Sequence, residues 1–546
     1  MNYIYPPRPF RYYFTLVMLL AGYFFGPIYG FGQTCPLNGT TSITNYPNTF
    51  YPGSQATVSA GAKSITLGAA SLGTDAIKIG DILLVIQMQG AQIGTSNDNS
   101  YGDGVSSPIA NGYLNNANLL AGNMEYVLAT NTVPLTGGIL NIQTALVNSY
   151  KNANYATDGQ YRYQLVRVPV YFNLKLNSTI TAPVWNGTTG GVLVLYAVDS
   201  LLLNGQTVDA SGAGFRGGAG RQLGGDNSSA FTDYRTMSTV KANGSKGEGI
   251  AGTPRYINNA GALLDNGAAN EGYLNGSYGR GAPANAGGGG TDGQPSSNAY
   301  NSGGGGGGNG GAGGVGGNAW FDGVAVGGNQ GSTFGQVAPS RMIMGGGGGA
   351  GTTNDGTGTP GGGFSSSGAA GGGIVIVMAN VVSGTGTINV NGASGNTTTL
   401  NDASGGGGAG GSALLYIATG SLANITVTAI GGTGGSNSGL GARHGPGGGG
   451  GGGIIYSNGT LNAASSSAAG PSGLTAGNTN YGAGGGSTGV VKQNITQSQT
   501  STFPSSCTIL PLEFISVTAN DNSGMVAVGW EVAREVDVQE YIVEKS

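Results

Sequence analysis

Histidine, cysteine and charged side chains are scarce in this chain of 546 residues. It has one histidine, His444, and two cysteines, Cys35 and Cys507. Asp, Glu, Lys and Arg together make up 8% of the residues, against about a quarter in an average globular domain. A net charge of −4 provides no basic surface for nucleic acid, so we expect no such partner. Sparse acids and a single histidine also leave little material for acid–base catalysis.

Glycine is the residue in excess. The 113 glycines and 20 prolines make up about a quarter of the chain, which approaches the composition of low-complexity proteins. Hydrophobic residues nevertheless reach 38% and come in blocks of Val, Ile and Leu, which favours order over disorder. Short apolar runs such as Ile82–Ile86 are typical of buried strands, and no window shows helical periodicity over a dozen positions. The sequence therefore predicts an all-β fold with long glycine loops.

The first 33 residues have the pattern of a secretory signal peptide. Arg8 and Arg11 precede an apolar stretch over 12–25, and a small-residue triplet follows at 30–32. The apolar stretch is shorter than the roughly 20 residues that span a bilayer, so we expect export and no membrane-spanning segment in the mature chain. Export permits a disulfide, and a Cys35–Cys507 bridge would clasp the two ends of the body. Two unpaired, buried thiols are the alternative.

A unit of glycine, an apolar run, a polar turn and a second alternating strand recurs along the chain. It begins near residues 190, 372, 411 and 451, and the last three starts are 39 and 40 residues apart. Such a fixed period is typical of stacked β-solenoids and related arrays. We therefore expect a β-rich N-terminal domain over 34–180 and a glycine-rich, solenoid-like array over 181–500, with an insert at 221–371.

Runs of consecutive glycines stand at Gly303–Gly308, Gly345–Gly349 and Gly447–Gly453. An ordered glycine loses more backbone entropy than any other residue, so such runs stay ordered only when their backbone groups find partners. They could bundle as extended, polyproline II-like segments that bond laterally, because glycine lets two backbones approach closely. They could equally be flexible loops, as glycine-rich linkers are by default. The sequence leaves both interpretations open.

Candidate sites are few. Asn97, Asp98, Asn99 and Asp103 offer the oxygen ligands that calcium prefers, although such clusters are also ordinary turn material. His444 stands beside Arg443 in a glycine loop and is expected to be a solvated residue, not a general base. No Gly-Lys-Ser/Thr follows a strand, so a phosphate-binding loop is rejected. We expect no catalytic residue and no cofactor.

Tyrosines gather near two arginines in the N-terminal region. Tyr161, Tyr163 and Tyr171 lie close in sequence to Arg162 and Arg167. Exposed tyrosines suit stacking on sugars or contact with proteins, whereas buried ones fill the edges of a β core. We favour the second interpretation.

The segment 510–546 differs from the rest. It reads "LPLEFISVTANDNSGMVAVGWEVAREVDVQEYIVEKS" and predicts three strands with a turn at 522–524. It resembles a module found near the C-termini of secreted and surface proteins of Bacteroidetes-type bacteria. The resemblance implies the start of a fibronectin-III-like β-sandwich over 508–546, of the kind that precedes a type IX secretion sorting domain. On this basis we expect the chain to be a fragment of a longer protein.

The body is similar to large, glycine-rich, adhesin-like surface proteins of the same bacteria. The similarity lies in "GDILLVIQMQGA" (80–91) and "GFRGGAGRQL" (214–223). It implies secretion and display at the cell surface, associated with the outer membrane. We therefore expect a structural or adhesive protein without catalytic activity, whose ligand is a glycan or another cell-surface protein. The alternative is a carbohydrate-binding or carbohydrate-active β-helix protein.

Overall fold

The computed structural model describes residues 39–156, 159–225, 230–237, 239–267, 271–273, 275–320, 325–439, 443–496, 512–522 and 525–535. These residues fall into two compact units, one within 33–507 and one containing the segment after 508. The described residues form strands and two short 3-10 turns (η2, Asn298–Tyr300, and η3, Phe364–Ser366), with no α-helix. The predicted all-β class is thus confirmed. None of the described residues forms a helix long and apolar enough to cross a membrane.

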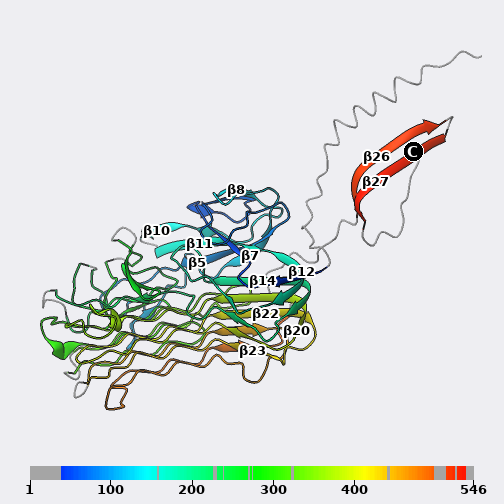
Figure 1. Ribbon diagram of the computed structural model, residues 1–546. Helices are drawn as coiled ribbons and strands as arrows, with labels where there is room; N and C mark the ends of the chain where they lie inside the picture. Colours follow the sequence, from blue (N-terminus) through cyan, green and yellow to red (C-terminus); the bar gives the residue numbers. More distant parts are fainter. Residues whose placement is uncertain are drawn as a thin grey trace, which may run out of the picture. The chain divides into compact units, whose positions relative to one another are not determined.

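A parallel sheet of seven strands, which we call the central sheet, forms the middle layer at one end of the larger unit (Figure 1). In spatial order its strands are β1 (Thr40–Ile43), β12 (Val170–Leu176), β14 (Val192–Leu202), β20 (Ile374–Ser383), β22 (Ser412–Thr419), β24 (Ile454–Ser457) and β25 (Val490–Lys492). The first strands of the four recurring units are neighbours here, because Val192 pairs with Ile374, Ile374 with Ser412, and Ser412 with Ile454. Each unit thus adds one strand to the sheet.

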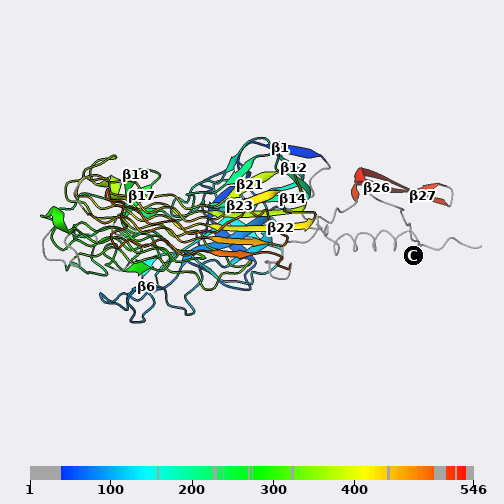
Figure 2. The same ribbon diagram turned by 90° about the horizontal axis from the view of Figure 1, so that it is seen from below.

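A second parallel sheet is formed by the second strands of the units (Figure 2). It contains β13 (Ile180–Thr181), β15 (Thr207–Asp209), β21 (Gly386–Asn389) and β23 (Ile425–Thr428). Val208, Ile388 and Val427 of this sheet belong to the same buried cluster as Leu193 and Val375 of the central sheet. The two parallel sheets therefore share one apolar core.

The other face of the central sheet packs against antiparallel strands. These are β10 (Ala153–Ala156), β11 (Gly159–Val168), β5 (Ile82–Gly90) and β7 (Met124–Leu128), with β2 (Thr49–Pro52) also paired to β11. Val192 and Ile374 share a buried cluster with Ile82 and Leu84, whereas Leu83 and Val85 point into a third cluster. Because successive side chains of a strand face opposite sides, strands buried on both faces appear as continuous apolar runs in the sequence.

Short strand pairs complete the larger unit. They are β3 (Thr57–Val58) with β9 (Tyr150–Lys151), β4 (Ser64–Leu67) with β8 (Gly138–Asn141), β6 (Asn111–Gly112) with β19 (Ala282–Pro283), and β16 (Gly217–Gly218) with β17 (Tyr256–Asn259) and β18 (Ala262–Asp265). Strand β12, which lies before residue 180, pairs directly with β14, which lies after it.

The glycine runs continue from the strands as ordered, hydrogen-bonded segments. The N–H groups of Gly303 and Gly306 donate to the carbonyls of Gly317 and Gly314, at 2.9 and 2.8 Å. Gly304 and Gly307 donate instead to Ser404 and Gly407, and Gly305 and Gly308 donate to Gly288 and Asn285. The direction of donation therefore repeats every third residue. Three residues per turn is the period of the polyproline II helix, and none of these six glycines has a positive φ.

The same pattern holds in neighbouring segments, which we call the glycine helices: 285–291, 303–308, 345–350, 404–411 and 447–453. Gly345 and Gly348 donate to Gly372 and Ala369, for example, and Gly346 and Gly349 donate to Gly308 and Gly305. Figure 1 shows these segments running side by side away from the labelled strands β20 and β22. Of the two interpretations that the sequence left open, the structure therefore shows the laterally bonded bundle.

Glycine is required in these helices because the backbones lie too close for a side chain. A β-carbon built on Gly304 would lie 2.0 Å from the carbonyl oxygen of Gly349, and one built on Gly306 would lie 2.0 Å from that of Gly449. The glycine Cα–H group occupies this space and points at the carbonyl, a geometry that supplies a weak additional hydrogen bond. Each such residue thus has one neighbour for its N–H and another against its Cα.

The second unit contributes an antiparallel hairpin of β26 (Leu512–Asn522) and β27 (Met525–Glu535). Val517 lies opposite Trp530, and Asn522 pairs with Met525, so the strand pairing extends up to the predicted turn. The predicted third strand, with Tyr541 and Val543, lies outside the described residues, as do the signal peptide and both Cys35 and Cys507.

Candidate functional site

On the side away from strands β20 and β22, the glycine helices end in a group of turns (Figure 1). We call this region the turn end. It contains the turns at 292–301, 354–362, 397–402, 437–439 and 475–481, which hydrogen bonds join. The amide of Asn301 donates to the carbonyl of Asn401 (2.7 Å), and the N–H of Asn437 donates to Leu474 (2.9 Å). Loops held by a rigid scaffold are where binding residues concentrate. The turn end is therefore the most suitable region of the protein for a binding site.

A hollow of ≈ 600 Å³ opens at the turn end. This volume falls within the range of about 300–1,000 Å³ that is usual for ligand pockets. The described residues of its wall combine a cation, an aromatic ring, hydroxyls and an amide with small residues. They are Gly439, Arg443, Thr475, Ala476, Gly477, Thr479, Asn480 and Tyr481.

Two hydrogen bonds hold Tyr481, which lines this hollow. Its hydroxyl donates to the carbonyl of Trp320 (3.2 Å), and its own carbonyl accepts the N–H of Asn318 (3.0 Å). Its φ is +43°, and that of Asn478 in the same turn is +58°. A left-handed conformation costs a residue with a side chain about 1–2 kcal/mol, and such residues gather at functional sites. The turn therefore fixes the backbone of Tyr481, and the hydrogen bond to Trp320 anchors the hydroxyl end of its ring.

Arg443 supplies the positive charge of the hollow. Its guanidinium lies 6.0 Å from the centre of the Tyr481 ring, a distance at the outer limit of a cation–π contact. Among the described residues no carboxylate forms an ion pair with it. Trp320, whose carbonyl accepts from Tyr481, is 51% exposed. A charged fork and the Tyr481 ring thus line the hollow, and the exposed residue Trp320 adjoins Tyr481 through its backbone carbonyl.

The neighbouring His444 is not the solvated loop residue that the sequence suggested. Its side chain is 2% exposed, and Nδ1 has no hydrogen-bond partner among the described residues. Burial lowers the pKa of the imidazole to about 4, and the backbone of Asn301 offsets this only in part. The expectation was wrong because His444 lies in a glycine-rich segment without an apolar pattern, so the sequence carried no sign that the ring is buried. A histidine that stays neutral at pH 7 serves here as a packed side chain.

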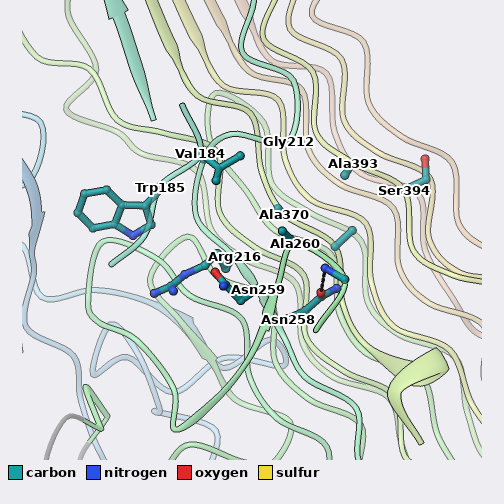
Figure 3. Close-up of a pocket in the computed structure, with 13 residues that line it drawn as sticks. Val184, Trp185, Gly212, Arg216, Asn258, Asn259, Ala260, Ala370, Ala393 and Ser394 are labelled. Atoms are coloured by element: carbon teal, nitrogen blue, oxygen red, sulfur yellow. Dashed lines mark hydrogen bonds between the residues drawn. The ribbon is translucent and has the colours of Figure 1, made fainter. Parts of the chain in front are cut away.

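A smaller hollow of ≈ 210 Å³ lies beside Trp185 and Arg216 (Figure 3). The Arg216 guanidinium forms two hydrogen bonds with the carboxylate of Glu248, at 2.8 and 2.9 Å, and the Trp185 indole N–H donates to the same carboxylate. Burial raises the pKa of Glu248, but the charge of Arg216 and the hydrogen bonds outweigh it, so the pKa lies below its usual value. The Glu248 carboxylate therefore has a structural role, because both of its oxygens are bonded within the protein.

Asn258 also lines the smaller hollow, and its side chain is likewise hydrogen-bonded within the protein. The amide of Asn258 donates to the carbonyl of Gly368 (2.9 Å), and its oxygen accepts the N–H of Gly261 (3.1 Å), the bond drawn in Figure 3. The volume is also below that of ordinary ligand pockets. Of the two hollows, we therefore take the one at the turn end as the candidate site.

The calcium candidates already use their side-chain oxygens as hydrogen-bond acceptors within the protein. Asp98 accepts from the N–H and hydroxyl of Ser100, and Asp103 accepts from the N–H of Val105. Asn97 accepts from the N–H groups of Tyr234 and Arg235, while Asn99 accepts from the Ser106 hydroxyl. The described residues contain no group of three His, Cys, Asp or Glu side chains that could hold a metal. Calcium binding at these four residues stays a prediction.

The tyrosines of the N-terminal region fill the β core, as we predicted. Tyr161 and Tyr163 are 2% and 1% exposed, and Tyr163 belongs to a buried cluster. Tyr171 is half-buried against the core between the two parallel sheets. Arg162 donates to backbone carbonyls, and Arg167 pairs with Asp81 at 2.6 Å. These residues therefore build the β core and do not form a stacking surface.

Sequence reasoning missed the turn-end hollow. Trp320 and Tyr481 are 161 residues apart, and no motif connects them. The turn "TAGNTNYG" (475–482) signalled only a loop. No protein-family model, no curated protein and no solved structure matches the chain.

Proposed function

We propose that this chain is an exported, non-catalytic attachment protein of the cell surface, in which a solenoid-like array of strands and glycine helices carries a binding end. In this proposal the strands anchor the scaffold and the turn end contacts the ligand. The expected ligand is a glycan or another cell-surface protein. The sandwich start and the adhesin-like resemblance belong to the same proposal.

The hydrogen bonding of the glycine helices in three directions carries the proposal. Each glycine of Gly303–Gly308 donates to a neighbouring segment, so the scaffold is held laterally on several sides. Such a scaffold presents its turns without the flexibility that glycine-rich chains usually have. Rigid presentation lowers the entropy that is lost on binding, which suits attachment through a small surface.

Binding of the fluorescently labelled, exported chain to host or neighbouring cells tests the proposal. We expect saturable binding that falls when Trp320 and Tyr481 are both replaced by alanine. The control is the double variant Val105→Ala and Val147→Ala, which removes exposed apolar side chains outside the turn end. Absence of saturable binding to every cell surface tried, or equal loss in both double variants, would contradict an attachment role for the turn end.

Carbohydrate binding is favoured over carbohydrate cleavage within this proposal. Two carboxyl groups flanking the scissile bond are the usual machinery of glycoside hydrolysis. The described wall of the turn-end hollow contains neither Asp nor Glu. Release of reducing ends from polysaccharides by the purified chain would favour the enzyme alternative.

For the route to the surface we propose type IX secretion with outer-membrane association. The support is the resemblance of 510–546 to modules that precede type IX sorting domains, together with the signal-peptide pattern over 1–33. Proteinase treatment of intact cells, followed by immunoblotting for the 33–507 unit, tests the location. Full protection from the proteinase in intact cells, with digestion after lysis, would contradict surface display.

A further inference from the structure

The turn-end hollow has the chemistry of an anion site set beside aromatic rings. Arg443 lines it with a guanidinium that is exposed and forms no ion pair with a described carboxylate. The other described residues of the wall are neutral, so no acidic side chain there opposes an incoming negative charge. A guanidinium presents a planar fork of donors that matches a carboxylate in two parallel hydrogen bonds.

Hydroxyl and amide groups line the same hollow as this charge. The Thr475 and Thr479 hydroxyls share one hydrogen bond of 2.9 Å, and the oxygen of the buried Thr475 hydroxyl also accepts the N–H of Thr479 (3.4 Å). The exposed Thr479 hydroxyl is therefore the one that faces a ligand. The N–H of Thr475 donates to the carbonyl of Thr479 (2.8 Å), so the turn that carries both hydroxyls is closed. Asn480 adds an exposed amide to the same wall. Alternating donors and acceptors of this kind match the hydroxyls of a sugar ring.

Aromatic side chains complete the site. Tyr481 lines the hollow in its left-handed conformation, and its hydroxyl ties it to the adjoining Trp320, which is 51% exposed. Large aromatic side chains give contact area at little cost in conformational entropy. Their flat faces suit the C–H faces of a pyranose ring.

We infer that the turn-end hollow binds an acidic sugar, namely a uronic acid residue of a polysaccharide, with Arg443 on its carboxylate and Tyr481 and Trp320 on its ring. This inference rests on the proposed function and names the ligand class of the same surface. A neutral sugar would leave the guanidinium unused, and a simple inorganic anion would leave the aromatic rings unused. The combination of both groups selects the carboxylated sugar.

The test measures binding of the full exported chain to oligosaccharides by isothermal titration. The panel contains oligomers of galacturonate, of mannuronate and guluronate, and of the glucuronate-containing hyaluronan. The methyl ester of each oligomer is the matched control, because esterification removes the charge and keeps the ring. We expect at least one acidic oligomer to bind about tenfold or more tightly than its ester, since a bidentate charged pair contributes this much. Inorganic phosphate is titrated as well.

Variants assign the effect to residues. Arg443→Gln is expected to remove the difference between acid and ester, whereas Arg443→Lys keeps the charge without the fork and restores it in part. Trp320→Ala is expected to weaken the acid and the ester alike. Lys492→Gln removes the same charge from exposed strand β25 and serves as the control. Thermal unfolding of each variant checks that the fold is kept.

Several results would overturn the inference. They are equal binding of acids and esters, binding of no acidic oligomer in the panel, phosphate binding as tight as oligomer binding, or loss in Lys492→Gln equal to that in Arg443→Gln. If the chain binds cells but no acidic oligomer, the sugar assignment fails while the attachment function stands. If it binds an acidic oligomer but no cells, the attachment function fails and the sugar site stands.

Discussion

The Cα of Gly306 lies against the carbonyl oxygen of Gly449, so close that a β-carbon there would be 2.0 Å from that oxygen. The N–H of Gly306 meanwhile donates to a different segment, at Gly314 (2.8 Å). One residue thus joins two neighbours by two faces of the same backbone. Because this holds along each run, the glycine content of the chain is a packing requirement of the fold.

Alanine at position 306 should destabilise the protein. The methyl group has no space, so Gly306→Ala is expected to lower the free energy of unfolding by about 2 kcal/mol or more, as overpacking does. Gly485→Ala is the matched control, because a β-carbon there meets nothing closer than 3.5 Å. Denaturant unfolding of both variants measures the difference. Similar stabilities for the two would contradict close packing at Gly306.

The glycine amides should exchange slowly with solvent. We expect the amides of Gly303–Gly308 and Gly447–Gly453 to exchange ~100-fold or more slowly than in an unstructured peptide, because their N–H groups are bonded and buried. The exposed residues Ala476 and Gly477 serve as the internal reference, and their amides should exchange quickly. Hydrogen–deuterium exchange with mass spectrometry measures both exchange rates. Exchange of the glycine runs at the rate of that turn would show that the runs are not held.

The buried pair of Arg216 and Glu248 should contribute far more than the exposed pair of Arg255 and Asp265. Glu248→Gln leaves the buried guanidinium without its counter-charge and is expected to cost about 3–5 kcal/mol. Asp265→Asn removes a partly exposed partner and should cost about 1 kcal/mol or less. Equal losses in the two variants, measured by denaturant unfolding, would argue against the buried geometry.

The pair also gives a pH dependence. The pKa of Glu248 in the folded state lies below its unfolded value, so its contribution is present above the unfolded pKa and is lost as the pH falls through the folded one. Glu248→Gln should therefore differ most from the wild type at neutral pH and least in strong acid. A constant difference from neutral pH to strong acid would contradict this charge state.

His444 should make the protein less stable in mild acid. Its folded pKa of about 4 lies below the ordinary value of 6.5, so between these values the unfolded chain binds the proton and the folded protein does not. Stability is therefore lost as the pH falls from about 6.5 toward 4. His444→Gln is expected to recover about 1 kcal/mol or more of the loss between pH 7 and pH 4.5. An unchanged pH dependence would show that the ring is not buried in its neutral form.

Asp292 should make the protein more stable as the pH falls, which is the opposite of the effect of His444. Burial raises its pKa to about 7, so the folded protein holds a proton between about 3.8 and 7 that the unfolded chain has released. Stability from this group rises as the pH falls through 7. Asp292→Asn should therefore stabilise the protein at pH 8 by about 1 kcal/mol or more relative to its effect at pH 5. The same difference at both pH values would contradict a raised pKa.

The strands could be predicted because their side chains carry the pattern. Side chains of Ile82–Ile86 alternate between the first and third buried clusters, and the apolar runs of the recurring units alternate between the first cluster and the one that the two parallel sheets share. Burial on both faces produces the continuous apolar blocks of the sequence. The spacing of the units likewise indicated which strands would be neighbours. Patterns in side chains were enough for this part of the fold.

The glycine helices and the candidate site could not be predicted in the same way. A glycine carries no pattern that tells which neighbour its N–H will meet, and Gly304 finds Ser404 only through the assembled array. His444 looked exposed because its glycine-rich neighbourhood in the sequence has no apolar pattern, although the folded protein buries the ring. Trp320 and Tyr481 meet across 161 residues, so their contact depends on the registers of the segments in between.

The threefold period of the glycine helices constrains how such a chain can change its length in evolution. Deleting one residue inside Gly303–Gly308 would rotate every later donor by a third of a turn and aim it at the wrong neighbour. Deleting three would restore the aim and shorten the helix by one turn. Insertions and deletions inside the helices should therefore occur in multiples of three, whereas the turns that close them are free to vary one residue at a time.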